Sequence, residues 1–117
     1  MEKEIESAKK RLKEKYNFEF PVVIVNGTGG SIQPTEIRIG RENDLEIIEV
    51  CVIHEAYHII FNIDQRESFK EKDKGNVMPY FQQEMWIWNK IRTDFPELSW
   101  QVGIAIMGEM VSLGLIK

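Results

Sequence analysis

Apolar positions in the first part of the chain recur at the spacing of an α-helix. Ile5, Ala8, Leu12 and Tyr16 are three or four residues apart, and lysines and glutamates fill most of the positions between them. This pattern is typical of a surface helix that buries one stripe of side chains. We therefore expect a scaffold helix over residues 2–16.

The next two segments have the composition of β-strands. Residues 18–25 are rich in β-branched and aromatic side chains and end at the glycine-rich stretch 26–30, which favours a turn. Residues 35–40 alternate polar and apolar side chains, as a half-buried strand does. Together these segments predict a small antiparallel sheet.

A long helix is expected after the second strand. Asn43, followed three residues later by Glu46, has the spacing of an N-cap with a reciprocating glutamate. Residues 45–61 contain neither Gly nor Pro, and one helical stripe includes Ile47, Val50, Cys51, His54, His58 and Phe61. Both histidines are thus predicted to lie on the inward face of this helix.

The remaining segments predict a connection, a second long helix and a tail. The polar stretch 64–76 favours an exposed connection. Pro79 suits the first turn of a helix and Pro96 bars its continuation, so a helix is expected over about 79–94. The tail from Ser99 is apolar but carries three glycines, which weaken helix and strand interpretations alike.

These elements predict a single α+β domain that covers residues 1–117. The composition is that of an ordinary globular protein, with 43% hydrophobic and 29% charged residues. A formal net charge of −4, without a basic patch, argues against nucleic acid as a partner.

Three further features concern the compartment. The apolar run 102–107 is too short to span a bilayer, so no membrane insertion is expected and the protein is predicted to be soluble. The first residues lack the basic and apolar regions of a signal peptide, and the single cysteine cannot form an internal disulfide. A cytoplasmic location is therefore predicted.

The pentapeptide 54–58, His-Glu-Ala-Tyr-His, carries the clearest chemical signal. Residues four apart on a helix differ by about 40° in direction, so His54 and His58 can bind one metal ion. Glu55 is turned by about 100° and can reach a water on the open side of the metal. Zinc would acidify that water and Glu55 would accept its proton, which predicts peptide hydrolysis.

Chance is the alternative, because such a match arises in roughly one chain of a few hundred at ordinary residue frequencies. The context favours function. The helix is capped and unbroken, its neighbouring side chains are uncharged, and the chain contains no other histidine. Two buried imidazoles each need a partner, and one metal ion would satisfy both.

The third ligand is predicted to be a carboxylate, because hydrolytic zinc takes three protein ligands and a water whereas structural zinc takes four. Glu84 is the expected ligand, since it interrupts an otherwise apolar stripe of the second helix. An exposed glutamate, or a pair with a nearby Lys or Arg, is the alternative. Other acidic candidates are Glu67, Glu71, Asp73 and Glu109.

Supporting roles stay open at this point. Cys51 precedes His54 by one turn and is either a small buried hydrophobe or a further ligand. Asn89 or Asp64 would be possible hydrogen-bond partners for a zinc-bound histidine. The candidates for stabilising an oxyanion are Tyr80, Tyr57 and Arg92.

With the His54-Glu55-x-x-His58 motif followed by a helix that bears Glu84, the chain resembles the gluzincin metallopeptidases, whose third zinc ligand is a downstream glutamate. Its size and order of elements look most like the minigluzincins, relatives of the catalytic domains of certain membrane-embedded peptidases. Thermolysin-like gluzincins carry an acidic residue four positions after the ligand glutamate, whereas this chain has Trp88 there.

The resemblance implies a minimal zincin-like α+β fold and a peptide or protein substrate that adds as a strand to the edge of the sheet, with residues 35–39 as the expected edge strand. It also implies a latent zymogen, in which the apolar segment 99–117 would block the cleft. A non-catalytic zinc-binding regulatory module is the alternative function. Glu55 distinguishes the two, because a site without catalysis has no use for a base beside its ligands.

Overall fold

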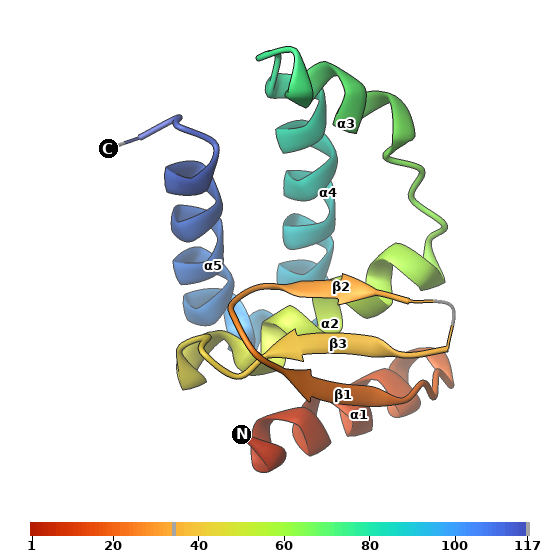
Figure 1. Ribbon diagram of the computed structural model, residues 1–117. Coiled ribbons are helices and arrows are strands. Elements are labelled where there is room, and N and C mark those ends of the chain that lie inside the picture. The colour runs from red at the N-terminus through yellow and green to blue at the C-terminus, as the bar shows by residue number, and fades with distance from the viewer. Residues whose placement is uncertain (34, 117) are drawn as a thin grey trace.

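A computed structural model describes residues 1–33 and 35–116 of the chain (Figure 1). Its elements, in chain order, are α1 (Glu2–Tyr16), β1 (Val22–Val25), β2 (Gly30–Ile32), β3 (Ile37–Gly40), α2 (Leu45–Ile60), α3 (Arg66–Asp73), α4 (Met78–Asp94), the short 3-10 helix η1 (Pro96–Leu98) and α5 (Ser99–Ser112). The predicted α+β class is confirmed. Lys117, the last residue of the predicted C-terminal segment, lies outside the described residues.

The small sheet has the order β1-β3-β2, with β3 parallel to β1 and antiparallel to β2 (Figure 1). The expected antiparallel pairing of the two longer strands was therefore wrong. The glycine-rich stretch leads into a third strand, β2, and a second reversal then brings β3 between the other two. Three exposed residues form β2, which is too short a segment to show a strand pattern in the sequence.

Glycines allow the backbone to pass closely at the end of the sheet. A Cβ atom on Gly40 would lie 2.3 Å from the carbonyl oxygen of Gly27, so a larger residue does not fit there. Gly27 and Gly29 have φ values of 100° and 73°, which favour glycine. The side-chain amide of Asn43 stabilises this turn. Its Oδ1 accepts a hydrogen bond of 2.9 Å from the N–H of Gly29, and its Nδ2 donates to the carbonyls of Gly29 at 2.9 Å and Gly40 at 2.8 Å.

The same contacts explain why Asn43 does not begin the next helix. The N-cap residue of α2 is Asp44, one residue later than predicted. The Asn43 side chain that was expected to cap α2 instead fixes the approach to β2, which lies beside that helix.

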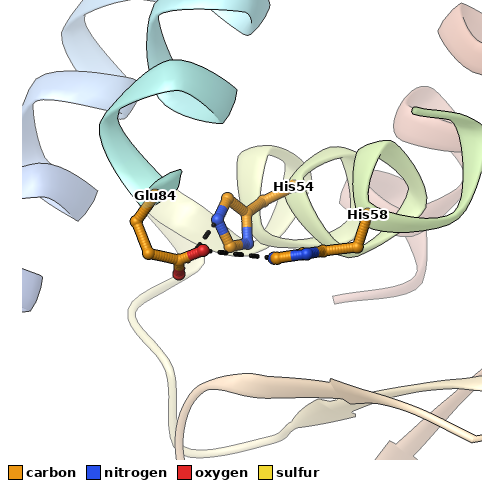
Figure 2. Close-up of side chains that lie close together, drawn as sticks. All are labelled: His54, His58 and Glu84. Carbon is orange, nitrogen blue, oxygen red and sulfur yellow. Dashed lines mark ion pairs between the residues drawn. The ribbon is translucent and has the colours of Figure 1, made fainter. Parts of the chain in front are cut away.

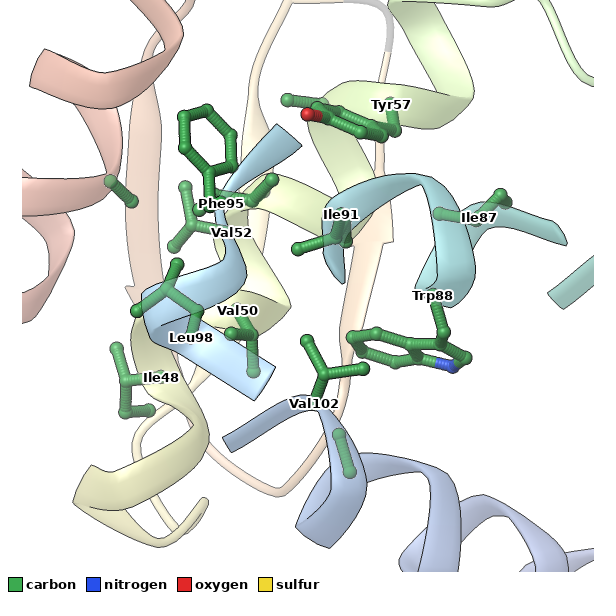
Figure 3. Close-up of a cluster of buried hydrophobic side chains, with 14 of the residues drawn as sticks. Ile48, Val50, Val52, Tyr57, Ile87, Trp88, Ile91, Phe95, Leu98 and Val102 are labelled. Carbon is green, nitrogen blue, oxygen red and sulfur yellow. The ribbon is translucent and has the colours of Figure 1, made fainter. Parts of the chain in front are cut away.

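Helix α2 is the centre of the hydrophobic core. It contacts α1, α4, α5 and the strands β2 and β3. Its fully buried apolar side chains pack with residues of α4, η1 and α5 (Figure 3), and they are Ile48, Val50, Val52, Ile53, Ala56 and Tyr57. A helix buried on this many sides holds its polar side chains in fixed directions.

Two segments differ from the sequence expectation. The connection 64–76 contains α3, a polar helix in which Ser68 is the buried residue. The tail from Ser99, whose state was left open, folds as α5 and buries Val102, Ala105 and Ile106. Gly103 of α5 faces the Arg92 side chain of α4, since a Cβ there would lie 3.2 Å from Nη2 of Arg92. Within residues 1–33 and 35–116, no helix combines the length and the apolar character needed to cross a membrane.

A buried hydrogen-bond network joins α1, α2 and α4. The carboxylate of Asp94 accepts hydrogen bonds from the hydroxyls of Tyr16 and Tyr57, the latter at 2.7 Å, and Lys90 lies 3.3 Å away. Burial, followed by the hydrogen bond to Asp94, raises the pKa of Tyr16 to about 12. Burial alone would raise the pKa of Asp94, but the two hydroxyls and Lys90 outweigh it and lower that pKa below its usual value.

We expect Tyr57→Phe to destabilise the protein by about 1.5–3 kcal/mol, because it removes a buried hydrogen bond to a charged group. The depressed pKa of Asp94 means that this stabilisation is present above the pKa of the unfolded carboxyl and is lost as the pH falls through the folded value. Urea denaturation of wild type and variant at neutral and acidic pH measures both effects. In an Asp94→Asn background the cost of Tyr57→Phe should shrink, and an unchanged cost would contradict the assigned partner.

Candidate metal centre

His54, His58 and Glu84 converge between α2 and α4 (Figure 2). Nε2 of His54 lies 3.3 Å from Glu84 Oε1, and Nε2 of His58 lies 3.2 Å from Glu84 Oε2. Each residue offers one ligand atom, and these atoms lie within 4.8 Å of one another, so the group could hold a metal ion. The structure thus brings together the three ligands that the sequence predicted.

Local structure sets this arrangement. The two histidines stand one turn apart on α2, and their rings meet edge to face at 4.9 Å between centroids. Glu84 is placed opposite them by α4, whose other buried residues are the apolar Ile87, Trp88 and Ile91. His54 and Glu84 are only 5% and 4% exposed, which shields this group from bulk water.

The environment of His54 shows whether a metal ion would fit. Its Nε2 atom is buried and, although Glu84 Oε1 lies 3.3 Å away, it makes no hydrogen bond to any residue in the described part of the chain. A buried polar atom without a partner is costly. An ion bound between Nε2 and the Glu84 carboxylate would supply the missing interaction, so the residues present fit a divalent cation.

The charges around the group also favour a cation. Burial alone would lower the pKa of His54, but the carboxylates of Glu55 and Glu84 outweigh it and raise this pKa to about 10. For Glu84, burial opposes ionisation, but the contacts with both histidines lower its pKa below the usual range. The carboxylates thus create a negative potential at His54 that stabilises a proton, and the same potential would attract a metal ion.

Glu55 lies beside the three ligands and lines the adjoining cavity of about 460 Å³. Its Oε1 is 3.4 Å from Nδ1 of His54, so it approaches the side of the ring opposite the ligand atom. Strand β2 passes directly over it: a Cβ on Gly30 would lie 3.1 Å from Cγ of Glu55. A carboxylate is thus held at the cavity wall, next to the edge of the sheet.

Two contacts to Glu84 add to the centre. The amide of Gln65 donates a hydrogen bond to Glu84 Oε2 at 3.0 Å, and the hydroxyl of Tyr80 donates to Oε1 at 3.4 Å. Burial, followed by the charges of nearby glutamates, raises the pKa of Tyr80, so its hydroxyl keeps its proton. Sequence reasoning missed Gln65, because it lies in a polar stretch with no periodic pattern.

The other candidates are placed as follows. The hydroxyl of Tyr57 bonds Asp94, and Arg92 packs near Gly103, so Tyr80 alone among the three proposed oxyanion donors lines the cavity. Burial, then the charges of two glutamates, raises the pKa of Cys51 to about 12, which keeps it a thiol at the cavity wall.

The predicted partners of a zinc-bound histidine lie elsewhere. The carboxylate of Asp64 pairs with Arg66 at 2.7 Å, and Asn89 is exposed. Instead, the ring of His54 stacks on Trp88, with centroids 4.2 Å apart and an angle of 18° between the planes.

The alternative acidic ligands separate into two groups. Glu67, Glu71 and Asp73 belong to α3 and are not part of the ligand group. Glu109 does line the cavity, where its Oε2 accepts a hydrogen bond of 2.7 Å from Nε1 of Trp88. Burial, followed by the charge of Glu84, raises the pKa of Glu109 to about 7.

We expect the purified protein to bind one divalent metal ion per chain, and His54→Ala and Glu84→Ala to abolish stoichiometric binding, because each variant leaves only two ligands. Elemental analysis after loading with zinc and gel filtration measures this. Glu67→Ala, which removes an exposed carboxylate on α3, is the matched control and should keep its metal. Metal-free wild type would rule out the centre.

Comparisons of the chain with protein-family models, with curated proteins and with solved structures give no match. The resemblance to the gluzincins therefore stays a prediction that rests on the motif, its spacing to Glu84 and the order of elements.

Proposed function

We propose that this chain is a zinc-dependent metallopeptidase. The observation that carries the proposal is the convergence of His54, His58 and Glu84, with the unligated carboxylate of Glu55 held beside them at an adjoining cavity. A group that only stabilised the fold would not require this additional, half-buried acid.

The choice of zinc follows from the ligand set. Two imidazole nitrogens and one carboxylate suit Zn²⁺, and three protein ligands leave a position open for reactants. Structural zinc sites use four protein ligands, commonly with cysteine, and Cys51 is a protonated thiol outside the group. The donor chemistry therefore supports a hydrolytic centre over a structural one.

In the proposed reaction, bound zinc would supply a Lewis acid that polarises a carbonyl and acidifies a water molecule. The Glu55 carboxylate would accept the proton from that water and later deliver it to the leaving amine. Glu55 is not part of the ligand group and lines the same cavity as His54 and Glu84, so its carboxylate would be free for this exchange. Tyr80 presents a protonated hydroxyl in the same cavity.

The sheet offers a place for an extended peptide. Strand β3 was expected to be the edge, but it is central, and the exposed edge strand nearest Glu55 is β2. A substrate that paired with β2 would run past the cavity, with its backbone held by main-chain hydrogen bonds. This arrangement favours an unfolded or flexible peptide as substrate.

Glu55→Gln should lower the rate of peptide cleavage by about 10²–10⁴-fold, because it removes the general base and leaves the zinc ligands in place. Zinc-loaded wild type and variant are incubated with an unfolded protein, and the products are followed by mass spectrometry. The matched control, Glu46→Gln, changes an exposed carboxylate on the same helix and should cleave normally.

Equal cleavage by wild type and Glu55→Gln would contradict the role of Glu55. Stoichiometric zinc in both proteins, without cleavage by either or by the Ile104→Ala variant described below, would favour the alternative, a non-catalytic zinc-binding regulatory module.

Latency forms part of the proposal, because α5 contributes Ile104, Ala105 and Glu109 to the cavity wall. Removal of the whole segment 99–117 is not a useful test, since it would also delete the core residues Val102 and Ala105. Ile104→Ala trims the part of the cavity wall that α5 contributes and leaves these core residues in place, so it should cleave faster than wild type. Peptide cleavage measured alongside thermal unfolding tests this, and equal rates would count against latency.

A further inference from the structure

We propose that Trp88 and Glu109 act together as positioning residues for the metal ligand His54, so that helix α5 contributes to metal affinity. This inference rests on the proposed metal centre and names side chains that support it from outside the ligand group. Three observations support it: the stacking of Trp88 on His54, the hydrogen bond between Trp88 and Glu109, and the burial of the indole.

The stacking fixes the plane of the imidazole. The rings of His54 and Trp88 lie 4.2 Å apart and are nearly parallel at 18°, and each of the two residues is 5% exposed. The contact between Nδ1 of His54 and Glu55, at 3.4 Å, is long for a hydrogen bond and restrains the ring weakly. The indole face is therefore the main support that keeps Nε2 directed toward Glu84.

Trp88 lies four residues after Glu84 on α4, so both side chains project from the same face of that helix, one turn apart. Helix α4 thus supplies both the proposed ligand Glu84 and the indole against which His54 packs. A shift of α4 would move the two together, which preserves their relative geometry.

Glu109 fixes the indole in turn. Nε1 of Trp88 donates a hydrogen bond of 2.7 Å to Glu109 Oε2, and this bond connects α4 to α5. This bond restrains the indole in its position against the imidazole.

The face of Trp88 also suits the charge that His54 carries. An imidazole that ligates a divalent cation acquires positive character, and aromatic faces, that of Trp most strongly, attract positive charge. The face of Trp88 therefore accommodates His54 both as a metal ligand and in its protonated, metal-free form. The contribution of the contact to affinity comes from holding the ring in the orientation in which Nε2 points toward Glu84.

The experiment measures the affinity for Zn²⁺ by competition with a chromophoric chelator, and the visible spectrum after loading with Co²⁺. Trp88→Leu removes both the stacking and the N–H donor, and should weaken Zn²⁺ binding by about 10–100-fold, the range found for residues that support metal ligands. Trp88→Phe keeps an aromatic face and loses the donor, so its loss should be smaller. The Co²⁺ spectrum of both variants should shift.

Glu109→Ala should also weaken binding, and Glu109→Gln should restore part of the loss because an amide oxygen still accepts from the indole. In the Trp88→Phe background, Glu109→Ala should have a reduced effect, since the bond between the two side chains is already absent. The matched control is Trp86→Phe, also on α4, where Trp86 is 48% exposed and contacts Phe61.

The outcomes are distinguishable. Wild type that binds Zn²⁺, with variants of equal affinity and unchanged Co²⁺ spectra, would overturn the positioning role and leave the proposed function intact. Wild type without metal would overturn both. Thermal unfolding of the metal-free proteins completes the test. If a variant binds Zn²⁺ more weakly only in proportion to its loss of stability without metal, and its Co²⁺ spectrum is unchanged, the residues have a structural role only. That result would reject the inference.

Discussion

Helix α2 has to fill the core and at the same time place one buried and one half-buried imidazole, and the rest of the structure depends on how this conflict is resolved. Six of its apolar side chains are fully buried among the surrounding elements, while His54 is 5% exposed on the same helix. Unpaired polar groups are costly at such depth. Glu84 offers a counter-charge from α4, but Nε2 of His54 makes no hydrogen bond to any described residue. A divalent ion would satisfy all three ligands at once, which is why the geometry favours a metal over a simple ion pair.

The sheet is built to bring an edge strand close to this centre. Close backbone contact at Gly40 and Gly27 lets β3 lie between its neighbours, and the amide of Asn43 holds the turn that leads to β2. Gly30 then passes Glu55 at a distance that leaves little room for a side chain. The glycine-rich stretch is thus a turn, as the sequence indicated, and its additional effect is to place exposed backbone beside the half-buried carboxylate of Glu55. These are local steric requirements with a consequence for the cavity.

Local periodicity was sufficient to predict α1 and α4, because each buries a stripe of side chains at helical spacing. Helix α2 was predicted with nearly correct bounds, but it buries side chains on several sides, and of the stripe predicted for it only Val50 and His54 are buried. The candidate ligand group could be predicted from spacing: helical geometry aligns His54 with His58, and a single carboxylate on an apolar face identifies Glu84. Strand order, by contrast, depends on contacts between distant segments, and β2 is too short and exposed to show a pattern. The contact of Glu109 with Trp88 depends on how α4 packs on α5, which no spacing within either helix determines.

Helix α5 shows why a tail cannot be assigned one role from composition alone. Its apolar residues suggested a removable plug, yet Val102 and Ile106 belong to the core. The same helix presents Glu109 to the cavity, where its carboxyl group accepts a hydrogen bond from the indole that stacks on His54. Because α5 contributes both to the core and to the cavity wall, its displacement would disturb both. Opening the cavity by releasing the whole helix would therefore cost core stability.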